Sequence, residues 1–173
     1  MTVRVELVDL RSMVGSEEAE PEESLSALPG PWAAIVELAK AVLAAERLEG
    51  NVVIALADEA AMADLNRRFR GVEGPTDVLS FCYGEEEGEW LEASAEEVED
   101  IGEVVLCPAV IERCAEEEGV EPGRRLAWSL VHGVLHLAGY DHEQDQGEMA
   151  QREAELLSRL DGLAAAVVVP PVR

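Results

Sequence analysis

The stretch from residue 51 to residue 56, Asn-Val-Val-Ile-Ala-Leu, is the feature that most constrains the fold of this chain. It is almost entirely apolar, and it has the length of an ordinary β-strand. A run of this kind is typical of a strand that is buried on both faces of its sheet. We therefore expect the chain to contain a sheet that is covered by helices.

The rest of the chain supplies further strands and the helices. Alternating apolar and polar residues predict a half-exposed first strand, and proline and glycine mark several helix boundaries. The order of elements predicts an α+β fold, in which a small mixed four-stranded sheet packs with about five helices. Strands are expected at about 3–7, 51–56, 77–83 and 102–107, and helices at about 31–48, 58–70, 108–119, after 122, and at about 144–160.

The second predicted helix has clear signals at both ends. Asp58 is placed to cap its N-terminus, and Gly71 interrupts the helical pattern. Met62, Leu65 and Phe69 recur at helical spacing, so we expect them to form the face that packs against the core.

Length and composition indicate one folded domain. A chain of 173 residues has the size of a single domain with a real hydrophobic core. A hydrophobic share of 48% excludes a disordered acidic tail, although 37 acidic residues against 13 basic ones give a net charge of −24. No apolar run approaches the roughly 20 residues that span a bilayer, and no signal peptide is visible. We therefore expect no membrane association and a cytoplasmic location.

The negative charge is concentrated in two predicted acidic loops, near residues 15–30 and 84–100. Residues 17–23 contain five Glu and residues 85–103 contain ten acidic residues, and without these fifteen charges the net charge falls from −24 to −9. A domain built to hold nucleic acid usually shows a basic face, which the total charge argues against. We interpret the acidic runs as solvated loops that favour solubility. The arginines gather at residues 67–70 and 124–125.

All three histidines of the chain, His132, His136 and His142, lie within eleven residues. The first two are four residues apart, so in a helix both rings project from one face and can reach a single ion. Gly139 can end that helix and let the chain turn back to present His142. A histidine on an apolar face is more often a packed core residue, but here every histidine stands at ligand spacing. Three imidazoles with an open fourth position are typical of a catalytic zinc site, which is predicted on this C-terminal helix and the turn after it.

The spacing His-x3-His-x2-Gly-x2-His is also that of the metzincin peptidases, which need Glu directly after the first His as general base. Here that position is Gly133, so the standard peptidase mechanism is disfavoured. Glycine inside a helix costs roughly 0.5–1 kcal/mol relative to alanine, and we interpret Gly133 as room for a bulky substrate beside the ion. Arg125 and Ser129 lie on the same helical stripe as the histidines. They are either groove residues, with Ser129 behind the ligands and Arg125 at the rim, or ordinary surface residues.

Two blocks of the sequence resemble the YbeY-type endoribonucleases, the bacterial rRNA maturation factors. One is the histidine block at 132–142. The other reads Leu-Asn-Arg-Arg-Phe-Arg-Gly at 65–71 and continues with Pro-Thr-Asp-Val-Leu-Ser-Phe at 75–81. Together with residues 102–107, the resemblance covers about residues 50–160.

The resemblance implies a zinc-dependent, single-strand-specific RNA hydrolase of α+β fold that acts in 16S rRNA maturation and ribosome quality control. It implies that residues 1–173 form one metal-dependent endoribonuclease domain. It also implies one Zn²⁺ per chain bound by His132, His136 and His142, and a functional arginine that aligns with Arg70. The predicted catalytic residues are Arg70 and His132. The implied partners are single-stranded RNA or rRNA and the small ribosomal subunit, and no DNA is expected.

The residues by themselves leave the role of Arg70 open. A guanidinium can bind bidentately to the negative charge that develops on phosphorus oxygens during phosphodiester cleavage. Arginine near a helix C-terminus is also favoured by the helix dipole, by a few tenths of a kcal/mol. The resemblance favours the functional role, in a metal-assisted hydrolysis. Asp141 is interpreted as an acceptor that orients an imidazole ring, while the attacking nucleophile and the general base stay open.

The sequence departs from the family pattern at three places. Cys82 stands where proline is usual, Glu103 stands where aspartate is frequent, and the stretch 84–100 is longer and more acidic, which argues against broad contact with RNA.

Two other functions stay open. One is a metallopeptidase or other metallohydrolase with a base from elsewhere in the fold. The other is a non-catalytic ribosome assembly factor with a structural metal.

Overall fold

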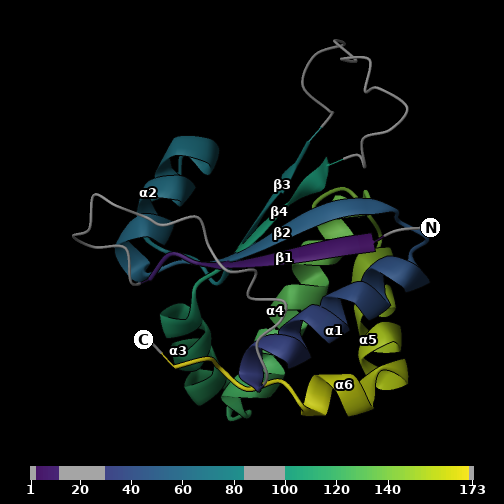
Figure 1. Cartoon of the computed structure of the whole chain (residues 1–173). Helices are drawn as coiled ribbons and strands as arrows, with labels where there is room; N and C mark the ends of the chain where they lie inside the picture. Colours follow the sequence, from purple (N-terminus) through teal and green to yellow (C-terminus); the bar gives the residue numbers. More distant parts are fainter. Residues whose placement is uncertain (1–2, 12–29, 84–99, 172–173) are drawn as a thin grey trace.

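The computed structural model describes residues 3–11, 30–83 and 100–171 of the chain (Figure 1). The α+β prediction is confirmed, and one short helix, Asp161–Ala165, was not predicted from the sequence. Most of the two predicted acidic loops lies outside the described residues. The strands are β1 (Val3–Asp9), β2 (Gly50–Leu56), β3 (Val78–Cys82) and β4 (Asp100–Leu106). The helices are α1 (Pro31–Ala45), α2 (Glu59–Arg70), α3 (Pro108–Glu118), α4 (Pro122–Leu137), α5 (Glu148–Arg159) and α6 (Asp161–Ala165).

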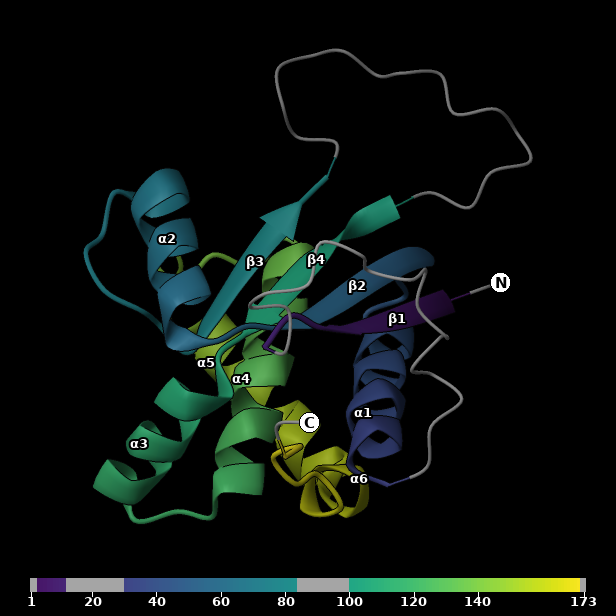
Figure 2. The same ribbon diagram turned by 60° about the vertical axis from the view of Figure 1, so that its left-hand side comes forward.

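The strands form one mixed sheet in the order β1-β2-β4-β3. β1, β2 and β4 run parallel to one another, whereas β3 is antiparallel to β4, with Ser80 opposite Val104. Figure 2 shows β3 at the edge of the sheet, beside α2. The mixed sheet was predicted, and its antiparallel edge strand borders the site described below.

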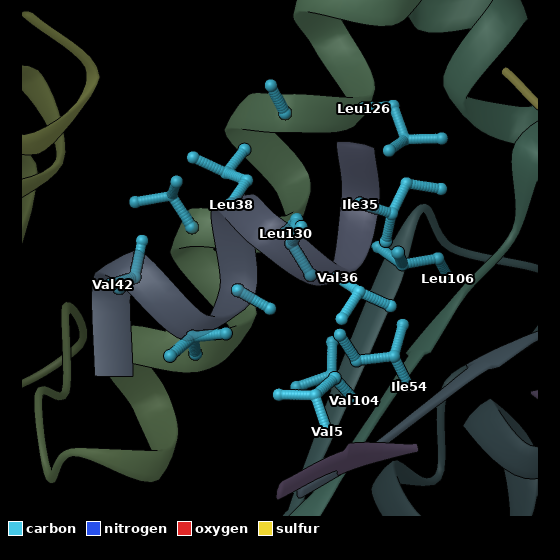
Figure 3. Close-up of a cluster of buried hydrophobic side chains, with 14 of the residues drawn as sticks. Val5, Ile35, Val36, Leu38, Val42, Ile54, Val104, Leu106, Leu126 and Leu130 are labelled. Carbon is cyan, nitrogen blue, oxygen red and sulfur yellow. The ribbon is translucent and has the colours of Figure 1, made fainter. Parts of the chain in front are cut away.

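Both faces of β2 are buried, as its apolar run predicted. Ile54 points into the larger core, where side chains of α1 and α4 such as Ile35 and Leu130 pack against the sheet (Figure 3). On the opposite face, Ala55 packs in a smaller cluster with Met62 of α2. Helix α2 therefore lies on one side of the sheet, and α1, α4, α5 and α6 lie on the other (Figures 1 and 2). None of the helices in the described ranges is long and apolar enough to cross a membrane.

Helix α2 begins and ends as its sequence predicts. The side chain of Asp58 accepts a hydrogen bond from a backbone N–H of the first turn at 2.8 Å, and Gly71 ends the helix with a φ of 66°. The predicted core face is correct for Met62 but wrong for Phe69, which is 63% exposed. Phe69 lies in the last turn beside the edge strand, and its ring contacts the margin of the sheet at Phe81, with ring centroids 5.0 Å apart.

The last long helix starts later than residue 144, the predicted start. The carboxylate of Asp145 accepts hydrogen bonds from the backbone N–H groups of Gly147 and Met149, both at 2.9 Å. Gly147 has a φ of 101°, which an L side chain rarely adopts. This turn delays the start of α5 to Glu148.

Helix α4 approaches the sheet most closely at Gly133. A β-carbon on this glycine would lie 2.6 Å from a methyl group of Val104 and 3.0 Å from one of Val78. The hydroxyl of Ser80 donates a hydrogen bond to the carbonyl oxygen of Gly133 at 2.8 Å. The interpretation of Gly133 as room for a substrate is therefore wrong, because the sheet itself occupies the space that a side chain would need.

We expect Gly133→Ala to lower the free energy of unfolding by about 1–3 kcal/mol, because the added methyl group overpacks a buried contact. Gly162→Ala, in helix α6, is the matched control, since nothing lies within 4 Å of its missing β-carbon. That change should leave stability unchanged or raise it, as alanine favours a helix. Urea unfolding of the three proteins checks this, and equal stability of both variants would contradict the packing argument.

Candidate metal centre

A groove of about 830 Å³ runs along β3 and contains the three histidines. Its walls come from the end of α2, from β3 and the residues just before it, from one face of α4, and from residues 139–143. Segments that are far apart in the sequence therefore meet here. The predicted residues Arg70, His132, His136 and His142 all line this groove.

The three histidines converge as their spacing predicts. His132 and His136 lie one turn apart on α4, with their Nε2 atoms 3.1 Å from each other. The helix ends at Leu137, and Gly139 follows with a φ of 98°, which turns the chain so that His142 faces the other two rings. One nitrogen from each ring lies within 4.8 Å of the others.

Hydrogen bonds determine which nitrogen of each helical ring carries the proton. A carbonyl oxygen only accepts, so Nδ1 of His136 donates to the carbonyl oxygen of Tyr140, 3.0 Å away. Nδ1 of His132 donates in the same way to the carboxylate of Glu153. In neutral rings both Nε2 atoms then carry lone pairs, and two lone pairs at this separation repel each other unless a cation lies between them.

This arrangement fits a metal ion. Nitrogen ligands at about 2.0–2.1 Å from a tetrahedral zinc are themselves roughly 3.3 Å apart, close to the separation of the two Nε2 atoms. Burial lowers the pKa of His136 below its ordinary value, and the neighbouring His132 ring lowers it further. A neutral imidazole is the form that binds metals. The three-histidine group can thus hold a metal ion.

Glu153 is the site residue that the sequence analysis missed. It lies on α5, and its side chain is only 8% exposed. The available signal was its position on the buried stripe of an amphipathic helix, between Met149 and Leu156, where a carboxylate needs a partner. The two helical rings are oriented by Glu153 and by the carbonyl of Tyr140, whereas the carboxylate of Asp141 accepts the backbone N–H of Glu143 at 3.0 Å.

Arg70 reaches the groove from the far side of β3. It is the last residue of α2, and its side chain is half exposed, with a guanidinium nitrogen 4.0 Å from the carboxylate of Glu143. Its neighbours Arg67 and Arg68 both pair with Asp64 and do not line the groove. Of these three arginines, Arg70 alone therefore lines the groove.

Arg125 and Ser129 form a buried polar network rather than a layer behind the histidines. The hydroxyl of Ser129 donates to the carboxylate of Asp77 at 2.8 Å and accepts from Arg125 at 2.6 Å. Arg125 lines the groove, but its guanidinium is bound by Asp77 and Glu118. This network ties the start of β3 to α4. Arg125 thus lies at the groove as one prediction had it, but it is already paired, and Ser129 binds Asp77 and Arg125 instead of standing behind the histidines. The ring of Trp128 connects this network to the histidines. The guanidinium of Arg125 lies over the Trp128 ring, 4.5 Å from its centroid, and the ring of His132 stacks on it.

The chain is similar to several known proteins. The family model described as Endoribonuclease YbeY matches residues 27–161. The Endoribonuclease YbeY of Pelotomaculum thermopropionicum is 43% identical over 131 residues, which cover 73% of this chain and 84% of that protein. The one of Desulfitobacterium hafniense is 36% identical, with 83% and 92% covered. The solution structure of TM1509 from Thermotoga maritima matches with a TM-score of 0.53 and 26% identity, over 99% of this chain and 100% of that one.

The curated relatives are named as endonucleases that act on RNA, a class of hydrolytic nucleases. The family model spans more than half of this chain, and these relatives are well above 30% identical over most of it. The chain belongs to the endoribonuclease YbeY family, which confirms the resemblance that the blocks at 65–81 and 132–142 indicated.

We expect Glu153→Gln to weaken the binding of a divalent transition metal by about 10- to 100-fold, the usual effect of losing an outer-shell carboxylate. Competition against a chromogenic zinc chelator measures this affinity. Glu155→Gln is the matched control, because Glu155 is an exposed residue of the same helix whose partners are arginines. Unchanged metal affinity in Glu153→Gln would show that the carboxylate does not support the site.

Proposed function

We propose that this chain is a zinc-dependent, single-strand-specific endoribonuclease that acts in 16S rRNA maturation and ribosome quality control. The observation that carries the proposal is the meeting of three imidazoles and Arg70 in one groove. Nitrogen ligands for a metal and a guanidinium for a phosphate are the parts that a phosphodiester hydrolase needs. Residues 1–173 act as one domain on single-stranded rRNA, with the small ribosomal subunit as partner and the cytoplasm as compartment.

The donor set favours zinc, with one ion per chain held by His132, His136 and His142. Three imidazoles suit zinc and leave a fourth position open, as in catalytic zinc sites. A zinc ion held by these residues would supply Lewis acidity, which can activate water and polarise phosphoryl oxygens. His132 and His136 keep their Nε2 atoms aimed at one point, because Glu153 and the carbonyl of Tyr140 hold their Nδ1 protons.

Arg70 is the residue that binds the scissile phosphate. Its guanidinium faces the groove, and its ion pair with Glu143 is long and exposed, so that pair holds it weakly. A planar guanidinium can donate two parallel hydrogen bonds to phosphoryl oxygens. These hydrogen bonds strengthen as negative charge grows on the oxygens, which lowers the barrier to cleavage.

The charge of the groove limits how RNA is held. Among the lining residues, five are acidic and only Arg70 and Arg125 are basic, and Arg125 is already paired. An RNA strand therefore makes few phosphate contacts with this surface, and free RNA binds weakly without the ribosome. The dependence of binding on salt is correspondingly shallow, at roughly 0.7 per neutralised phosphate.

Peptide hydrolysis is the alternative that the residues argue against. It needs a general base beside the ion that later protonates the amine leaving group. Gly133 has no side chain for this, and its neighbours Val134 and Leu135 are apolar and buried. Phosphodiester cleavage depends more on neutralising charge, which Arg70 and a metal supply without that base.

The test compares the wild type with His136→Ala on single-stranded RNA, duplex RNA and casein, with metal content measured on both proteins. We expect one zinc per chain in the wild type and much less in the variant. We expect the wild type alone to cut RNA, and only the single strand. Metal-dependent proteolysis without RNA cleavage would support a metallopeptidase instead. Rescue of ribosome assembly in cells by His136→Ala would support a non-catalytic assembly factor.

We expect Arg70→Ala to slow RNA cleavage by a factor on the order of 100 or more, because charge stabilisation at the phosphate is lost. Zinc content and melting temperature should barely change. Arg159→Ala serves as control, since Arg159 is an exposed arginine of α5 that pairs with Glu155 and does not line the groove. An equal loss of zinc in Arg70→Ala would show that this arginine supports the site structurally.

A further inference from the structure

Phe69 is the most exposed large apolar side chain among the described residues, at 63%. The chain contains only two phenylalanines, and they contact each other. The ring of Phe81, on β3, meets Phe69 edge to face, with centroids 5.0 Å apart and planes at 72°. Phe81 thus supports the ring of Phe69 from one edge and leaves most of that ring exposed.

Neither ring of this aromatic pair lines the groove, but both phenylalanines are next in sequence to residues that do. Arg70 follows Phe69 directly and lines the groove, and so do Ser80 and Cys82 on either side of Phe81. Side chains alternate along a strand, so Phe81 points to the α2 side of β3 while its two neighbours point to the α4 side. A strand of RNA whose phosphate is at Arg70 can therefore place an adjacent base over Phe69.

The surroundings of Phe69 carry the charge that such a strand needs. Arg67, Arg68 and Arg70 are three of the 13 basic residues of the chain, within four positions. Arg67 and Arg68 pair with Asp64, but their side chains stay 62% and 66% exposed, and exposed pairs of this kind are weak. A single aromatic ring among guanidiniums is typical of surfaces that bind single-stranded nucleic acid.

We propose that Phe69, supported by Phe81, is the stacking platform for one unpaired base of the RNA, next to the nucleotide whose phosphate binds Arg70. The proposal rests on the proposed function and adds a base subsite to it. It also explains single-strand specificity, because a base within a duplex is stacked between its neighbours and cannot lie on the ring. Any base has a π-face, so the subsite selects unpaired bases rather than a sequence.

The test measures how tightly the protein binds two labelled probes, by fluorescence anisotropy. One probe is a dodecamer of riboadenylate, and the other is the same ribose–phosphate chain without bases. EDTA is present to prevent cleavage. The two probes carry equal charge and differ only in the bases. We expect Phe69→Leu to raise the dissociation constant for the adenylate by about five- to 150-fold, the effect of losing one base–aromatic stack. The constant for the chain without bases should not change. Phe69→Tyr keeps the ring and should bind like the wild type.

Leu163→Ala, on α6, is the control for loss of an exposed apolar side chain away from the Phe69–Phe81 pair. Melting temperatures of all variants show whether each is folded. The proposal is overturned if the wild type binds both probes equally, or if Phe69→Leu weakens both to the same extent. Its failure differs from failure of the proposed function, since RNA cleavage by the wild type is measured separately. A wild type that cuts single-stranded RNA but binds both probes equally refutes the subsite alone.

Discussion

The close packing of α4 against β3 and β4 is the contact on which the rest of the site depends. Gly133 lets the helix lie so near the sheet that Val104 fills the space of a side chain, and Ser80 binds the helix through the Gly133 carbonyl. With the helix held there, its apolar face enters the core while His132 and His136 face the groove along β3. A shift of this helix along the strand would move both rings away from the other walls of the groove.

The imidazoles are then oriented by groups that α4 does not itself provide. Glu153 reaches His132 from α5, and the carbonyl of Tyr140 reaches His136 from the turn after the helix. Each bond holds the Nδ1 proton and so directs the Nε2 lone pair toward a common point. The turn also delivers His142. A metal-binding geometry is thus assembled by three segments, none of which could form it alone.

The negative charge of the chain limits how it can recognise RNA. With a net charge of −24 and mostly acidic groups along the groove, a broad phosphate-binding surface is not available. The proposed function therefore rests on a few strong local interactions: a metal ion at the histidines, the guanidinium of Arg70, and the ring of Phe69 for a base. Attraction of this kind acts over short distances, which agrees with the proposal that the RNA is met on the small ribosomal subunit.

Sequence patterns that span only a few residues were enough to predict many elements of the fold and the histidine site. The apolar run at 51–56 determines a strand buried on both faces, Asp58 determines a helix start, and the histidine spacing determines which nitrogens can share an ion. Glu153, Gly133 and Phe69 could not be understood in this way. The partners of Glu153 and Gly133 lie 21 and 53 residues away in the chain, and the exposure of Phe69 depends on the sheet ending beside it. The sequence by itself determined which groups can bind a metal and a phosphate. Only the tertiary structure decided that they face one groove, because that depends on how closely α4 packs against the edge of the sheet.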